Sequence, residues 1–163
     1  TTEIYTLSLH DALPIFVVMD DSPEFLNALR FAAIRAKKTG GGVTILGIVA
    51  PEEFQHWIGV GEAMRAEARE RIEEHFKVFS KWMVDKEGLE PELIIREGEK
   101  ATEVMAAIDE DPEVGVLVLG AGATGEGPGP LVTQLVARQT ASMSVPITVV
   151  PGGLTKERII AVS

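Results

Sequence analysis

The chain has 163 residues, a formal net charge of −10 and 45% hydrophobic residues. This length and composition are typical of one soluble globular domain. The sequence contains no cysteine, which excludes disulfide scaffolds and thiol catalysis. Its acidic balance argues against a general nucleic-acid binder, and no apolar run reaches the roughly 18 residues of a membrane span. We expect a single cytoplasmic domain with neither nucleic acid nor a membrane as partner.

The first residues, Thr1–Ile15 (TTEIYTLSLHDALPI), differ in pattern from the rest of the chain. They follow neither helical nor strand periodicity, and they resemble the translation of a sequencing-adapter oligonucleotide. We therefore expect a non-native segment at 1–15, the domain at 16–153 and a tail at 154–163. The alternative is a genuine N-terminal extension. If the segment is non-native, Pro14 and Ile15 stand in for the start of the first strand.

Next come two apolar runs, each followed by an amphipathic segment. Ile15–Met19 (IFVVM) predicts a strand buried in a parallel sheet. Ser22 as N-cap and Pro23 as first helical residue predict a helix, which Gly40 ends. The next predicted elements are a strand at Val43–Val49, a loop or helical turn at Pro51–Gly61, and a long helix at Gly61–Lys86.

The same alternation continues to the end of the domain. The predicted elements are a strand at Leu93–Arg96, a helix at Ala101–Asp109, a strand at Val114–Leu119, a helix at Leu131–Gln139 and a strand at Pro146–Val150. Five strands alternating with helices predict a single-domain α/β fold, with a doubly wound five-stranded parallel sheet and helices on both faces. In such folds ligands bind beyond the carboxyl ends of the strands.

A glycine-dense segment follows the fourth predicted strand. Gly120–Pro130 has the sequence GAGATGEGPGP, in which backbone amides could approach a phosphate closely. It matches neither a Walker A motif nor a dinucleotide fingerprint, and Glu126 would repel a phosphate. The alternative interpretation is a tightly turning loop without a ligand.

Asp20 and Asp21, at the end of the first strand, resemble the magnesium-holding acidic pair of a response-regulator receiver. That function also requires an aspartate at the end of the third strand and a lysine at the end of the fifth. The sequence has Arg96-Glu97 and Val150-Pro151 there, so we expect no receiver. The three histidines have no zinc-site spacing, and we expect no metal site.

Five segments together resemble the universal stress protein family. They are VVMDDSPEFLNALRFAAIRA, VTILGIVAP, IIREGEKATEVMAAI, VGVLVLGAG and VPITVVPG, in that order. The resemblance implies strand order 3-2-1-4-5, a role in stress survival and no defined catalytic reaction. It also implies a homodimer through the Pro146–Val150 edge strand, although the C-terminal segment Arg158–Val162 could cover the same edge instead.

The resemblance also implies a nucleotide cleft. The adenosine end would lie at Asp20, Asp21 and Val49, and phosphates would lie over Gly120, Gly122, Gly125, Gly127 and Gly129, with Thr133 near the position of the family's Gly-Ser/Thr pair. This sequence has Ala123 in place of the family's second glycine. Two functions stay open. One is a non-catalytic dimeric stress protein with a degenerate cleft. The other is a binder of ATP (with Mg²⁺) or AMP, with slow ATP hydrolysis.

Overall fold

The computed structural model describes residues 13–51, 61–123 and 125–163. The elements are β1 (Ile15–Met19), α2 (Pro23–Thr39), β2 (Val43–Val49), α3 (Gly61–Glu87), β3 (Glu92–Glu97), α4 (Lys100–Glu110), β4 (Val116–Ala121), α5 (Pro130–Val132), the π-helix η2 (Thr133–Gln139), the 3₁₀ turn η3 (Thr140–Ser142), β5 (Ile147–Pro151) and α6 (Lys156–Val162). The predictions for segment 1–12 and for most of the Pro51–Gly61 connection fall outside the described residues.

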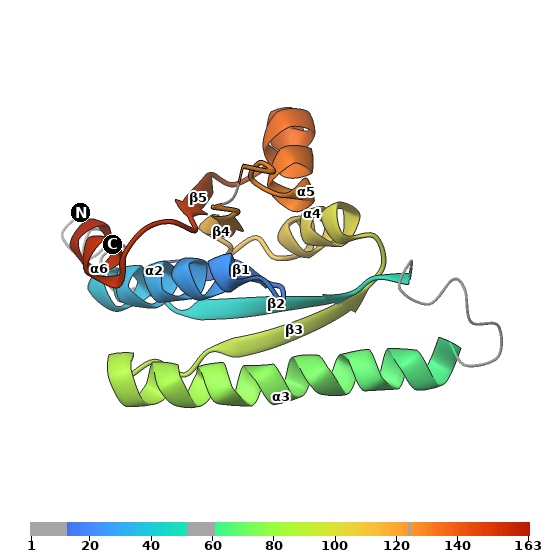
Figure 1. The fold of residues 1–163 in the computed structure, drawn as a ribbon, viewed down its shortest axis with the longest axis horizontal. Helices are drawn as coiled ribbons and strands as arrows, with labels where there is room; N and C mark the ends of the chain where they lie inside the picture. The colour runs from blue at the N-terminus through green and yellow to red at the C-terminus, as the bar shows by residue number, and fades with distance from the viewer. Residues whose placement is uncertain (1–12, 52–60, 124) are drawn as a thin grey trace.

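The five strands form one parallel sheet in the order β3-β2-β1-β4-β5, which confirms the predicted fold class and strand order (Figure 1). In the central strand β1, all five residues are buried. Val17 of β1 pairs with Ile45 on one side and Val118 on the other. Parallel strands covered on both faces have this uniformly apolar character.

Helices cover both faces of the sheet. On one face α2 and α3 pack over a core that includes Val17, Ile45 and Phe25. On the other face α4 and the α5–η2 segment pack over a core that includes Val18 and Leu117. The alternation of side chains along each strand divides the apolar residues between these two cores.

Helix α2 begins and ends where the sequence predicts. Pro23 is its first residue and Ser22 its N-cap, and Gly40 takes the left-handed conformation (φ 75°) after the last turn. The Ser22 side chain makes no capping hydrogen bond to the helix. Instead, its hydroxyl donates to Oδ1 of Asp20.

Two predicted elements differ in their bounds or type. Strand β4 begins at Val116 rather than Val114, because its pairing with β1 starts where Ile15 meets Val116. The predicted helix at Leu131–Gln139 is helical throughout, but only its first turn is α-helical and the rest is the π-helix η2.

The C-terminal segment Arg158–Val162, the alternative cover considered for the sheet edge, does not lie across β5. This segment belongs to α6, which packs against α2 rather than across β5 (Figure 1). Ile159 is fully buried there, and Lys38 Nζ donates to the carbonyl oxygen of Ser163 at 2.7 Å. Ile159 and the C-terminal carbonyl thus attach α6 to the α2 side of the molecule.

Candidate functional site

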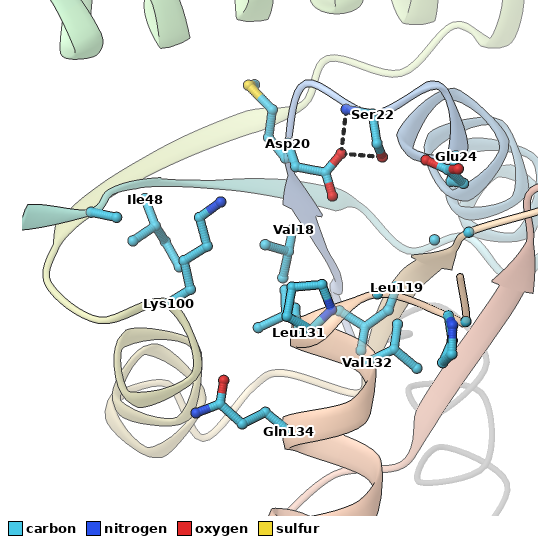
Figure 2. Close-up of a pocket in the computed structure, with 18 of the residues that line it drawn as sticks. Val18, Asp20, Ser22, Glu24, Ile48, Lys100, Leu119, Leu131, Val132 and Gln134 are labelled. Carbon is cyan, nitrogen blue, oxygen red and sulfur yellow. Dashed lines mark hydrogen bonds between the residues drawn. The ribbon is translucent and has the colours of Figure 1, made fainter. Parts of the chain in front are cut away.

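A cavity of about 580 Å³ opens at the carboxyl ends of β1, β2 and β4. Its apolar wall consists of Val18, Ile48, Ala50, Leu119, Leu131 and Val132 (Figure 2). This volume lies within the range of small-molecule sites, and the position is the one at which open α/β sheets bind ligands.

Asp20 projects from the end of β1 at the rim of this apolar wall. Its Oδ1 accepts hydrogen bonds from the backbone amide of Ser22, at 2.8 Å, and from the Ser22 hydroxyl (Figure 2). Both bonds go to the same oxygen. They fix the orientation of the carboxylate, and the other oxygen, Oδ2, can accept a hydrogen bond from a ligand.

Glu24 lies on the first turn of α2 and also lines the cavity. The pKa of Glu24 is held below its ordinary value, mainly by its proximity to the Ser22 side chain and next by its own backbone amide. Desolvation opposes this shift, and the Ala123 backbone makes the smallest contribution to lowering the pKa. The Glu24 carboxylate is therefore ionised at neutral pH.

A second wall comes from the start of α4. Glu99 is the N-cap and accepts hydrogen bonds from the amides of Ala101 (3.2 Å) and Thr102 (2.8 Å) and from the Thr102 hydroxyl (2.6 Å). The hydroxyl and amide of Thr102 lower the pKa of Glu99 most, and a hydrogen bond from Gln134 contributes to the same shift. Beside Glu99, Lys100 contributes the ammonium group of this wall (Figure 2).

The glycine-dense segment folds back on itself at the mouth of the cavity. The Gly122 amide donates to the Pro128 carbonyl at 3.1 Å, closing the loop. Gly127 and Gly129 adopt φ of +95° and +100°, a conformation that other residues rarely take. A Cβ on Gly122 would lie 2.8 Å from the Gly127 oxygen, so backbone packing alone requires glycine there.

The structure brings together part of the predicted site. Asp20, Gly120, Gly122, Gly127 and Gly129 all line the main cavity.

The other predicted residues lie elsewhere. Asp21 and Val49 line a smaller cavity of about 70 Å³ on the α3 side of the sheet. Thr133 borders a third cavity outside the loop, and Gly125 borders none of these three cavities.

Several residues that line the cavity were not predicted from the sequence. One of them, Ile48, could have been predicted from the alternation of side chains along its strand. Ile48 lines the main cavity where Val49 was expected. Successive residues of a strand point to opposite faces, so the side chain at 48 faces α4 and the one at 49 faces α3. Other missed residues include Val18, Glu24, Glu99, Lys100, Leu131 and Gln134, several of which lie far from the predicted loop in sequence.

Neither a metal site nor a membrane segment is seen in the described parts of the chain. Within residues 13–51, 61–123 and 125–163, no group of three or more His, Cys, Asp or Glu is placed to hold a metal ion. None of the helices in these ranges combines the length and apolar character needed to cross a membrane.

Comparisons with a family model and with solved structures point to the same protein family. The model of the universal stress protein family matches residues 13–151. The solved structure of universal stress protein UspA from Lactobacillus plantarum matches with TM-score 0.71 and 16% identity, over 85% of this chain and 97% of that one.

Two similar structures contain nucleotides. A universal stress protein from Archaeoglobus fulgidus in complex with dAMP has TM-score 0.57 and 20% identity, over 86% of this chain and 98% of that one. Another universal stress protein, in complex with cAMP, has TM-score 0.54 and 16% identity, over 88% of this chain and 99% of that one. The comparison with curated protein sequences gave no match. The family match spans the whole sheet: the chain belongs to the universal stress protein family.

Proposed function

We propose that this protein is a non-catalytic, cytoplasmic stress-response protein whose cleft binds an adenine nucleoside or mononucleotide. The observation that carries the proposal is the cavity of about 580 Å³ with an apolar wall and Asp20 at its rim. The Archaeoglobus fulgidus relative in complex with dAMP and the relative in complex with cAMP support it, because they share this fold.

The residues around the cavity suit the two parts of a nucleoside. Val18 and Ile48 on the sheet and Leu131 on the α5 side provide apolar surfaces for a planar base. Oδ2 of Asp20 can accept a hydrogen bond from a ribose hydroxyl, since both bonds from Ser22 go to Oδ1. An apolar wall with one fixed polar group is the usual design of a small-molecule site.

We also propose that two copies pair through β5. Val149 of this strand is 36% exposed, and Ile147 is half-buried. In the described sheet β5 pairs only with β4, and α6 lies against α2. An apolar strand edge left open is prone to pairing, and an antiparallel, symmetric pairing with a second copy would cover it.

A thermal-shift assay tests the nucleoside proposal. Adenosine, AMP, cAMP and ATP are each added at millimolar concentration, with and without Mg²⁺. A ligand at ten times its Kd adds about 1.4 kcal/mol of stability, which raises Tm by about 3–6 °C for a domain of this size. We expect shifts for adenosine and AMP that do not depend on Mg²⁺. No shift with any adenine compound would contradict the proposal.

A matched variant locates the binding. Leu131→Trp places a larger apolar side chain in the cavity and should reduce the adenosine shift. Val78→Trp adds the same side chain at a site on α3 that is 66% exposed, and it should leave the shift unchanged. Equal shifts in the two variants would place the ligand outside the cavity.

A further inference from the structure

We propose that Glu24 occupies the anion position of the glycine-rich loop, so that the cleft selects a nucleoside without phosphates. This inference rests on the nucleoside cleft proposed above and names its ligand class. Glu24 is then the residue that determines specificity against phosphorylated ligands.

The Glu24 side chain lies between the glycine-rich loop and the residues that follow β5. A Cβ built on Gly152 would lie 2.5 Å from Glu24 Cγ, and one built on Gly122 would lie 3.8 Å from Glu24 Oε1. The backbone of Ala123 is close enough to the same carboxylate to lower its pKa. A carboxylate of the protein therefore already lies where a phosphate oxygen would approach this part of the loop.

Other donors of the loop region are also satisfied internally. The Gly122 amide is bonded to the Pro128 carbonyl at 3.1 Å. The Thr133 amide and hydroxyl both donate to the Gly129 carbonyl, at 3.1 and 2.9 Å. Pro128 and Pro130 have no amide hydrogen to offer. A phosphate group could use the Gly122 and Thr133 donors only by breaking these bonds.

The charges of the residues that line the cavity also disfavour a phosphate group. Its ionisable lining residues are four acids, Asp20, Glu24, Glu99 and Glu126, and one base, Lys100. In Figure 2, Lys100 lies on the Ile48 side of the cavity and Glu24 on the opposite side. A phosphate over the loop would thus lie closer to Glu24 than to the ammonium group, and like charges at short range repel. An uncharged nucleoside avoids this repulsion.

Titration calorimetry with adenosine, AMP and ATP tests the inference in wild type and in Glu24→Gln. The readout is the ratio of the Kd for ATP to the Kd for adenosine. Glutamine keeps the side-chain shape but removes the charge, so this ratio should fall at least tenfold, and the AMP ratio by a smaller factor. In Glu113→Gln, which removes an exposed charge outside the cavity lining, both ratios should stay within about threefold of wild type.

A second measurement needs no variant. Raising the salt from about 0.05 M to about 0.5 M shortens the Debye length from about 14 Å to about 4 Å. Screening should therefore strengthen the binding of ATP relative to adenosine in the wild-type protein. A weaker relative binding of ATP at high salt would overturn the inference, because it would indicate a cationic phosphate site.

The outcomes separate the two proposals. If adenosine binds and the ratio of the Kd for ATP to the Kd for adenosine falls only in Glu24→Gln, both the nucleoside cleft and the role of Glu24 are supported. If ATP binds wild type more tightly than adenosine, or if the two variants change the ratio equally, the role of Glu24 is wrong but the nucleoside cleft stands. If no adenine compound binds wild type or either variant, the proposed function itself fails.

Discussion

A Cβ placed on Gly120 would lie 2.6 Å from the backbone oxygen of Glu24. Gly120 is the next-to-last residue of β4 and lies against the first turn of α2, and the close contact leaves no room for a side chain. The sequence pattern predicts that this glycine contacts a phosphate. The structure gives it a packing role that applies with or without a ligand.

Gly120→Ala should therefore destabilise the protein by about 1–3 kcal/mol, because the backbone of α2 must shift to admit the methyl group. Gly125→Ala is the matched control: a Cβ there meets nothing within 4 Å, and Gly125 is not among the glycines of positive φ. It should change stability by less than about 1 kcal/mol in either direction. Urea denaturation of both variants measures the difference, and equal stabilities would contradict the packing role.

The N-cap of α4 should make stability depend on pH. Replacing Glu99 by alanine removes the acceptor for the amides of Ala101 and Thr102 and should cost about 1 kcal/mol at pH 7. The folded pKa of Glu99 lies below its ordinary value of 4.5, so its contribution is complete above that pH. It is lost as the pH falls through the folded pKa.

The stability difference between wild type and Glu99→Ala should accordingly shrink below about pH 4. Denaturant titrations at several pH values check this. Glu90→Ala is the control, because it removes an exposed carboxylate just before β3. A difference that stays constant down to pH 3 would show that the Glu99 carboxylate does not act as the charged cap.

The proposed dimer can be broken at one position. Val149→Lys places a charge on the open edge strand and should convert the dimer to a monomer at tens of micromolar, because lysine on a strand edge opposes pairing. Val78→Lys, on the exposed face of α3, should remain dimeric. Light scattering coupled to gel filtration reports both masses, and a monomeric wild-type protein would remove the basis of the proposal.

The expectation that the first residues are non-native also has a direct test. A chain beginning at Leu13 keeps the Pro14 carbonyl, which accepts from the Gly115 amide at 2.9 Å, and the Ile15 amide, which donates to Gly42 at 2.9 Å. Its Tm should stay within about 4 °C of the full chain, equivalent to at most about 1 kcal/mol. A larger loss of stability would indicate that residues 1–12 belong to the domain.

The sheet could be predicted because its strands are apolar runs between clear boundaries. Ile15–Met19 and Val43–Val49 are uniformly buried, and the structure has the same bounds. Ser22, Pro23 and Gly40 likewise mark the ends of α2 in the sequence. Local composition was sufficient in each of these cases.

The cleft was less predictable because it depends on contacts between distant segments. Nothing local to Glu24 shows that it lies against Gly122 and Gly152, about 100 and 130 residues further along the chain. The position of α6 against α2 and the position of Glu99 in the cavity wall also depend on contacts between segments that are distant in sequence. Local periodicity could have identified Ile48 instead of Val49, since alternation along β2 decides which side chain faces α4.

Calorimetric titration of the wild-type protein at low salt, with adenosine and then with ATP, tests the nucleoside cleft most directly. Adenosine has about 19 heavy atoms, and at about −0.3 kcal/mol per atom its Kd would be of the order of 0.1 mM. The account predicts adenosine binding in this range, with ATP at least tenfold weaker. Submicromolar binding of ATP, with a large preference over adenosine, would contradict it.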